Sequence, residues 1–230
     1  MVNLSDILGH IRDVQKRIAE AAVRAKRQPE DIALLAVTKT MPVEVIKKAY
    51  EGGLRDFGEN RVQEAVEKVG SLPSDIRWHL IGQLQSNKIN KILGKFVLIH
   101  SVDSLHLAEA LSARIGLENQ EVLLEVNTSG EISKAGVAPE ETIVTAEKIA
   151  KLPGLKLKGL MTVGPLTEDP QKKREAFKKL KGLFEELKGK GFMGTGFSIL
   201  SMGMSGDFET AIEEGSTLVR VGTALFGSRG

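Results

Sequence analysis

Residues 32–40 read IALLAVTKT, an apolar run that ends in a lysine between two threonines. A continuous apolar run of this length is typical of a strand covered on both faces, as strands are in a parallel sheet. Lys39 then stands at the carboxyl end of that strand. This pattern decides the fold, because it recurs along the rest of the chain.

Seven further apolar or β-prone runs follow, and a helical pattern separates each from the next. We expect strands at residues 32–38, 54–58, 77–81, 96–100, 121–127, 155–161, 196–201 and 217–221. We expect helices at residues 43–51, 61–69, 87–92, 104–115, 139–151, 171–187 and 207–214, after an amphipathic helix over residues 3–27. Parallel strands need such crossovers, and eight of them can close. The sequence therefore predicts an α/β fold, a (β/α)8 barrel with an extra N-terminal helix; a doubly wound open sheet is the alternative.

The composition limits both the domain organisation and the function. The chain has 230 residues and no linker rich in Pro, Gly or Ser, which predicts one domain over residues 1–230. A net charge of +2 and an aromatic content of 4% argue against a nucleic-acid partner. No cysteine is present, which excludes disulfides and favours a reducing cytoplasm. The N-terminal stretch is too polar for a signal or a membrane span, so we expect a soluble, cytoplasmic protein.

Two charged residues in or beside apolar strands carry the strongest chemical signal. A lysine at the edge of an apolar wall loses its charge more easily than one in water, so Lys39 can act as an amine nucleophile that forms a Schiff base. A lysine that merely reaches out to water is the plainer interpretation. Arg220 places a permanent charge in the apolar run LVRV, where it must meet an acid such as Glu125 or a ligand. For Arg220 both alternatives stay open.

The loops after the last two expected strands are rich in small residues. They read SMGMSGD (201–207) and VGTALFG (221–227). In (β/α)8 barrels the working face lies at the carboxyl ends of the strands, and a phosphate site commonly follows strands seven and eight. Small residues let backbone N–H groups approach an anion, although glycine also serves ordinary turns. With Lys39 and Arg220, these loops suit a phosphorylated, nitrogen-containing aromatic ligand, and the expected cofactor is pyridoxal 5′-phosphate (PLP).

Other kinds of site find little support in the sequence. The histidines at positions 10, 79, 100 and 106 show no compact metal-ligand pattern, so we expect no metal site. A Walker loop, a GxGxxG after a strand and a serine-nucleophile signature are all missing. His79 alternates with Trp78 in the third expected strand, and packing inside the barrel is favoured over assistance to a ligand.

Motifs spread along nearly the whole chain resemble the pyridoxal phosphate homeostasis proteins. They are AVTKT (36–40), FGENRVQE (57–64), WHLIGQLQSNK (78–88), NTSGEISKAG (127–136), GLMTVG (159–164), LSMGMSGDFETAI (200–212) and GSTLVRVGTALFG (215–227). This family is similar in fold to the barrel domain of bacterial alanine racemases, but lacks their second, β-rich domain. The resemblance thus implies the same barrel that the strand pattern predicts.

The resemblance also implies a set of cofactor-binding residues. These are Lys39, Asn60, Ser201, Met202, Arg220, Gly222 and Thr223. Lys39 matches the lysine that forms the internal aldimine with PLP, and Arg220 matches the arginine facing the pyridine nitrogen. Ser201, Gly222 and Thr223 match the phosphate cradle, to which the Met202 amide adds. Asn60 matches a position near the cofactor ring.

Four further positions follow less specifically from the resemblance. His79, Ile81 and Met161 are expected to line the pocket, and Lys134 is a secondary lysine near its mouth.

The resemblance implies a PLP carrier that takes part in intracellular PLP (vitamin B6) homeostasis, without robust catalysis and without catalytic residues. An arginine beside the pyridine nitrogen leaves that nitrogen unprotonated, which makes PLP a poorer electron sink. Alanine racemases add a tyrosine base from a partner subunit's second domain, whereas the only tyrosine here, Tyr50, falls within an expected helix. A PLP-dependent amino-acid racemase with Lys39 as sole base is the alternative. A barrel that binds another phosphorylated metabolite is the third interpretation.

The expected partners follow from the same resemblance. We expect a monomer, because the domain that builds the racemase dimer is missing. PLP-dependent apoenzymes are expected to make transient contact, and neither nucleic acid nor a membrane is expected as a partner.

Overall fold

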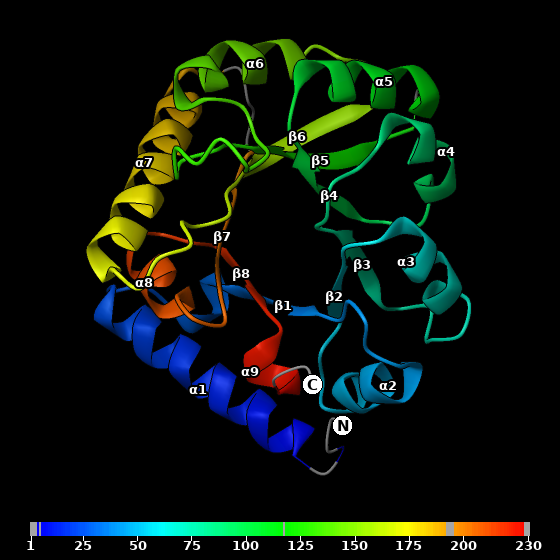
Figure 1. Ribbon diagram of the computed structural model, residues 1–230, viewed down its shortest axis with the longest axis vertical. Coiled ribbons are helices and arrows are strands. Elements are labelled where there is room, and N and C mark those ends of the chain that lie inside the picture. Colours follow the sequence, from blue (N-terminus) through cyan, green and yellow to red (C-terminus); the bar gives the residue numbers. More distant parts are fainter. Residues whose placement is uncertain (1–3, 5, 117, 192–195, 228–230) are drawn as a thin grey trace.

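The computed structural model describes residues 4, 6–116, 118–191 and 196–227. Eight parallel strands form a closed barrel in which neighbours in sequence pair and β8 pairs with β1. They are β1 (Ala33–Val37), β2 (Asp56–Glu59), β3 (Arg77–Leu80), β4 (Leu98–Val102), β5 (Gln120–Glu125), β6 (Leu155–Met161), β7 (Ile199–Met204) and β8 (Leu218–Val221). Figure 1 shows the strands at the centre of a ring of helices. The predicted (β/α)8 barrel is confirmed, and the alternative of an open sheet is wrong.

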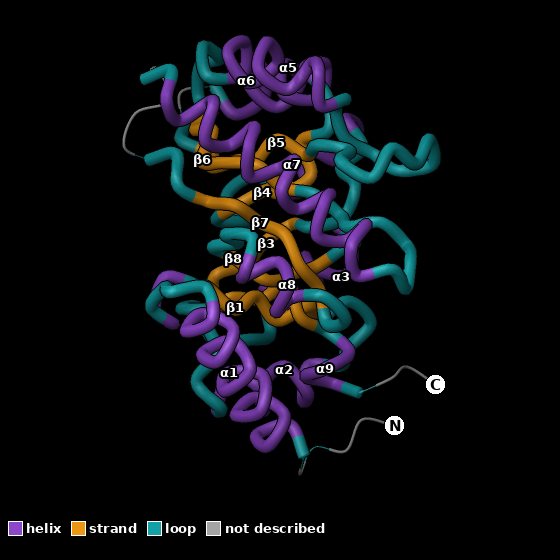
Figure 2. The backbone as a smooth tube through the Cα atoms, turned by 90° about the vertical axis from the view of Figure 1, so that its left-hand side faces the viewer, coloured by secondary structure: helices purple, strands orange, loops and turns teal. Residues whose placement is uncertain are grey.

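The helices that connect the strands cover the outside of the barrel (Figure 2). They are α2 (Val43–Glu51), α3 (Val62–Val69), α4 (Ile89–Ile92), α5 (Leu105–Ile115), α6 (Thr142–Ile149), α7 (Pro170–Gly189) and α8 (Phe208–Glu213), with 3-10 turns η1 (Pro29–Asp31), η2 (Ser86–Lys88) and η3 (Pro139–Glu141). The extra N-terminal helix is α1 (Ile7–Arg24), which packs against α8 and the short α9 (Thr223–Phe226). None of the described helices has both the length and the apolar character needed to cross a bilayer.

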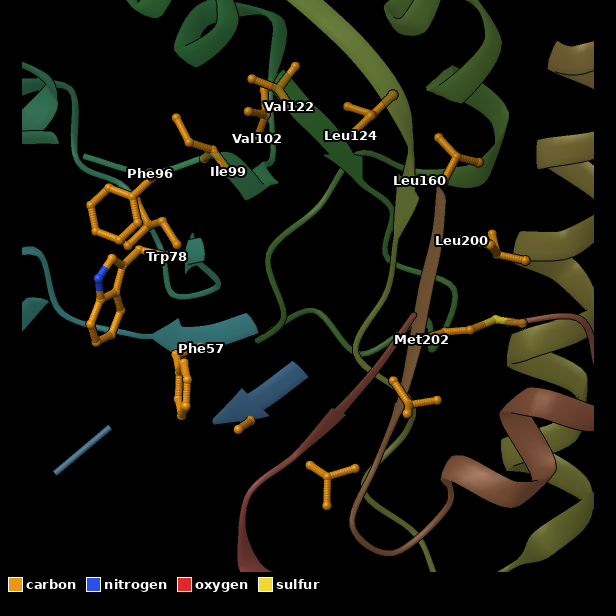
Figure 3. Packing of buried hydrophobic residues seen from close by; sticks show 14 of the residues in the cluster. Phe57, Trp78, Phe96, Ile99, Val102, Val122, Leu124, Leu160, Leu200 and Met202 are labelled. Carbon is orange, nitrogen blue, oxygen red and sulfur yellow. The ribbon is translucent and has the colours of Figure 1, made fainter. Parts of the chain in front are cut away.

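The main hydrophobic core lies between the barrel wall and the surrounding helices. Phe57, Trp78, Phe96 and Met202 belong to this layer and are nearly or fully buried (Figure 3). Strand side chains alternate between this layer and the barrel interior. A separate apolar cluster, formed by Leu98, Leu123 and Met161, is small. Because apolar residues fill so little of the interior, polar side chains take much of the remaining space.

Strand β7 ends three residues later than the sequence pattern predicts. The expected strand spans residues 196–201, whereas β7 spans Ile199–Met204. Its pairing with β8 shifts in register between Ser201 and Met204, where Gly203 adopts φ +94°. A side chain at Gly203 would place its Cβ 2.5 Å from that of Ala211. This irregularity extends the strand, so the residues that follow it at the carboxyl end begin at Ser205.

Strands β6 and β7 approach most closely at Gly159. The backbone there has φ +157°, and a Cβ atom would lie 1.7 Å from the carbonyl oxygen of Ile199. Two backbones cannot keep this spacing around a side chain, so glycine is required for the barrel wall to close here.

Replacement of Gly159 by alanine should therefore lower the free energy of unfolding by about 3 kcal/mol or more, because the wall must move apart. Urea unfolding followed by circular dichroism measures this loss. The matched control is Gly182→Ala on the exposed face of α7, where no atom lies within 4 Å of the new Cβ. That change should stabilise the protein by about 0.5–1 kcal/mol, and equal effects at both positions would contradict the prediction.

Candidate ligand-binding site

A cavity of about 580 Å³ lies at the carboxyl ends of the strands. Its walls are formed by Val37, Lys39, Asn60, Ile81, Val163, Met204, Ser205, Gly206, Arg220, Gly222 and Thr223. Five of the seven residues predicted to bind the cofactor are therefore together: Lys39, Asn60, Arg220, Gly222 and Thr223. The pairing of β1 with β8 explains this, because Leu35 is in register with Arg220 and the two strand ends are neighbours.

Lys39 lines this cavity and is partly buried. The threonines on both sides of it are held by carboxylates. Thr38 is fully buried and its Oγ1 donates a hydrogen bond of 2.6 Å to Glu59. Thr40 has φ +64°, a strained conformation for a β-branched residue, and its N–H donates to the carboxylate of Glu64. The backbone that carries Lys39 is thus fixed at its two neighbours.

Lys68, which is buried, joins these two carboxylates. Its Nζ donates to the carbonyl oxygen of Thr38 at 2.9 Å, to Glu59 Oε1 at 2.8 Å and to Glu64 Oε1 at 2.6 Å. Burial raises the pKa of Glu59, and the hydrogen bonds from Lys68 and Thr38 oppose that rise. Since α3 supplies Lys68 and Glu64, the outer helix positions the loop that carries Lys39.

Arg220 enters the cavity wall from the interior side of β8 and is only 4% exposed. Its Nη1 donates to the carbonyl oxygen of Ser201 at 2.9 Å and to Ser201 Oγ at 2.7 Å, and its Nη2 donates to the carbonyl oxygen of Thr162 at 2.8 Å. Burial lowers the pKa of Arg220 to about 10, while the charges of Glu125 and Asp207 oppose the decrease. The guanidinium therefore stays charged at neutral pH, held mainly by neutral oxygens.

Another part of the cavity wall consists of two loops, after β7 and after β8, that Ser205 ties together. Its Oγ accepts hydrogen bonds from the backbone N–H groups of Gly222 at 3.1 Å and Ala224 at 3.2 Å. Asp207 Oδ1 accepts from the N–H of Met204 at 2.6 Å, which fixes the turn after β7. Small residues that let backbone N–H groups approach an anion, together with the hydroxyls of Ser205 and Thr223, suit a phosphate group.

The structure does not bring the other two predicted residues to the cavity. Ser201 is fully buried within β7 and contacts Arg220 from below. Met202 points into the outer core layer (Figure 3) and is also fully buried. Sequence analysis missed Ser205, which follows Ser201 and Met202 in the same motif. The reason is that the extension of β7 at Gly203 is not visible as an apolar pattern.

The four positions that the resemblance predicts less specifically also lie partly at the cavity and partly away from it. Ile81 lines the cavity, whereas Met161 belongs to the interior apolar cluster and His79 lies deeper in the barrel. Lys134 forms an ion pair with Glu131 at 2.9 Å and donates to the carbonyl oxygen of Gly164 at 2.6 Å, on the loops beside the cavity. Tyr50 is remote from the cavity wall, and its hydroxyl donates to Asp75.

Two observations limit other kinds of site. A second cavity, of about 570 Å³, is lined by Trp78, Phe96 and Gln120 near the amino ends of the strands, and no predicted site residue borders it. Among the residues that the structure describes, no cluster of three or more His, Asp or Glu side chains could hold a metal ion.

Comparisons with known proteins agree with this geometry. Residues 11–230 match the family model described as alanine racemase, N-terminal domain. Alanine racemase from Corynebacterium glutamicum shares the fold, with a TM-score of 0.77 and 16% identity over 99% of this chain and 62% of its own. The fold and the cavity at the strand ends thus define a barrel of the alanine racemase N-terminal type.

Closer relatives specify the family further. The pyridoxal phosphate homeostasis proteins of Aquifex aeolicus and Pseudomonas aeruginosa are 47% and 45% identical to this chain, and the matches cover 94% and 98% of it and 95% and 97% of the relatives. PipY of Synechococcus elongatus, solved with PLP bound, has a TM-score of 0.78 and 37% identity over 91% of this chain and 100% of its own. The chain belongs to the pyridoxal phosphate homeostasis protein family, as its motifs predict.

The charge on Glu125 makes stability depend on pH. Glu125 is buried in β5, and that burial raises its pKa from 4.5 to about 7, although Arg220 opposes the shift and Asp103 adds to it. Glu125, which the sequence offered as an acid partner for Arg220, thus interacts with it through charge, without a hydrogen bond between the two side chains. Between pH 4.5 and 7 the folded state binds a proton that the unfolded state releases, so this group reduces stability as the pH rises.

Glu125→Gln should therefore be more stable than the original protein at pH 8, by roughly 2–3 kcal/mol, and the difference should vanish towards pH 4. Urea unfolding at a series of pH values measures this difference. Glu186→Gln, on the exposed face of α7, is the control and should change stability by less than about 0.5 kcal/mol throughout. A constant difference for Glu125→Gln across the pH series would contradict the prediction.

Proposed function

We propose that this protein binds PLP in the cavity at the strand ends and takes part in controlling the intracellular level of that cofactor. The observation that carries the proposal is the convergence of Lys39, Arg220 and a rim of small and hydroxyl residues in one cavity of suitable size. PLP, when bound, supplies an aldehyde that condenses with amines and a ring that accepts electrons. The names of the curated relatives and the PLP-bound PipY structure support the same ligand.

Each part of the cavity has a role in this proposal. Lys39 is the residue that would hold PLP covalently, since its Nζ amine can condense with an aldehyde and release water. Arg220 would serve the ring nitrogen, to which its charged guanidinium could donate a hydrogen bond but not a proton. Thr223, Gly222 and Gly206, together with Ser205, would hold the phosphate, and Asn60 would border the ring. Ser205 replaces Ser201 and Met202 of the sequence analysis in this role.

The wall of the cavity favours a carrier over a catalyst. Among the described residues that line it, Lys39 carries the one amine or carboxylate group that could act as a base, since the guanidinium of Arg220 stays charged. Two-base racemisation needs a second acceptor on the opposite side of the substrate. A racemase with Lys39 as sole base is the competing function, and Lys39-dependent deuterium exchange at the α-carbon of amino acids would support it.

The proposal includes how the cofactor is passed on. We propose that the protein acts as a monomer in the cytoplasm and delivers PLP to apoenzymes through transient contacts. Light scattering at low concentration tests the monomer, and transfer of PLP to an added apoenzyme in the presence of a trap for free PLP tests direct delivery.

Addition of PLP to the purified protein should produce a long-wavelength absorbance band, and Lys39→Ala should lack it. Borohydride reduction should fix the cofactor, and mass spectrometry of peptides should locate it on Lys39. Lys48→Ala, which removes a surface ion pair with Glu51, is the control and should keep the band. A band of equal intensity in Lys39→Ala would overturn the covalent site.

Ser205→Ala should weaken PLP binding by about tenfold, because the two loops lose the hydroxyl that joins them. Pyridoxal, which lacks the phosphate, should bind about equally to the original protein and the variant. Equilibrium titrations with both ligands measure these affinities, and Ser198→Ala at the far end of β7 is the control. Equal losses for PLP and pyridoxal would show that Ser205 does not act on the phosphate.

A further inference from the structure

A line of polar side chains crosses the interior of the barrel below the cavity. Ser201 Oγ lies 2.7 Å from Arg220 Nη1 and 3.0 Å from His100 Nδ1. On the other side of the ring, His100 Nε2 lies 3.0 Å from His79 Nδ1. His79 Nε2 then lies 3.1 Å from Asp56 Oδ1. Five side chains from β8, β7, β4, β3 and β2 thus form an unbroken hydrogen-bonded chain.

The chain joins the two ends of the barrel. Arg220 lines the cavity at the carboxyl ends of the strands. Asp56 is the first residue of β2, at the amino end, where its side chain is 19% exposed and pairs with Arg77 on β3. Between them, Ser201 and His100 are fully buried and His79 is only 5% exposed. Water therefore has little access to the middle of the chain, and each member depends on its neighbours for hydrogen bonds.

With both imidazole rings neutral, the donors and acceptors allow one direction for the chain. Arginine can only donate, so Ser201 Oγ accepts from Arg220 and its own hydrogen is left for His100 Nδ1. His100 must then carry its proton on Nε2 and donate to His79 Nδ1. His79 in turn carries its proton on Nε2 and donates to the carboxylate of Asp56. In this arrangement every buried polar atom of the chain has a partner.

The reverse direction leaves groups unsatisfied. If both neutral rings donated from Nδ1 instead, the hydrogen of Ser201 would lack a partner in the chain, and the unprotonated Nε2 of His79 would face the carboxylate of Asp56. The electrostatics agree with the first direction. Burial is the main cause that lowers the pKa of His100 well below its usual value, and the charge of Arg220 adds to it, so this ring is neutral. Burial would raise the pKa of Asp56, but hydrogen bonds from His79 and Arg77 outweigh it and lower the value to about 2.

We infer that Asp56, His79 and His100 are positioning residues for Arg220, which they couple through a one-directional hydrogen-bonded chain to the ion pair of Asp56 with Arg77 at the opposite end of the barrel. Polarised chains of this kind strengthen each member, so a change at one end alters the orientation and hydrogen-bond strength of the guanidinium at the other. This inference rests on the proposed function, because it makes the ring of PLP the group that senses Arg220.

The direction of the chain is tested without ligand. Long-range proton–nitrogen NMR correlations separate the two neutral tautomers of histidine from the charged ring. The variant His10→Asn/His106→Asn leaves two of the four histidines, those of the chain. Both should carry the proton on Nε2. A proton on Nδ1 of either ring, or a charged ring at neutral pH, would overturn the inference whatever the protein binds.

The coupling to the ligand is tested from the far end. Asp56→Ala should weaken PLP binding by about fivefold and shift the absorbance maximum of the bound cofactor, although Asp56 does not line the cavity. His79→Leu, which breaks the chain one step closer, should have at least that effect. The control is Glu121→Ala, which removes the ion pair with Lys158 on β5 and β6 near the same end of the barrel and should leave affinity and spectrum unchanged.

The outcomes separate the two proposals. A normal PLP band in both Asp56→Ala and the control would overturn the coupling while the proposed function stands. A similar change in both would assign the effect to general destabilisation and also overturn it. No band in the original protein would overturn the proposed function and, with it, the effect on the ligand, whereas the NMR result would still decide the direction of the chain. Should Asp56→Ala not fold, His79→Leu carries the same comparison.

Discussion

The buried guanidinium of Arg220 is the charge around which the inside of this barrel is arranged. A charge taken out of water must recover its lost hydration from the protein. Here the recovery comes chiefly from two backbone carbonyls and one hydroxyl, while Glu125 and Asp207 contribute only through their charge. An arginine satisfied in this way keeps hydrogen-bonding capacity for a ligand. A tight ion pair with a carboxylate would have used that capacity.

In this arrangement one set of side chains stabilises the fold and a different set lines the binding site. The interior apolar cluster is small, so most apolar burial lies in the outer layer between the barrel wall and the helices. Because that layer faces away from the cavity, the interior is free to hold histidines, a serine and an arginine. The outer layer also acts on the site at one point. Lys68, from α3, reaches Glu59 and the carbonyl of Thr38, and so reaches the neighbours of Lys39.

The sequence predicts the fold, and it predicts that Lys39 and Arg220 lie in one site. The reasons are physical. Apolar strands alternating with amphipathic helices lead to a closed parallel barrel, and in that fold Lys39 and Arg220 meet. Ser205 could not be predicted, because the irregularity at Gly203 lengthens β7 by a register shift that composition does not report. The chain of histidines is also hidden: His79 and His100 are separated by 21 residues and Ser201 by another 101, and only strand register makes them neighbours. His79 could be interpreted as packing, but its partners could not be named.

The pairing of β8 with β1 has a further consequence for how the protein is made. Lys39 and Arg220 belong to the first and last strands, and the two become neighbours only when those strands pair. A nascent chain on the ribosome has Lys39 exposed early but lacks Arg220 and the loop after β8 until all eight strands have been synthesised. Contacts of such long sequence separation form late in folding. The complete cavity thus arises with the last step of barrel closure, and no chain that still lacks β8 can offer it to a ligand.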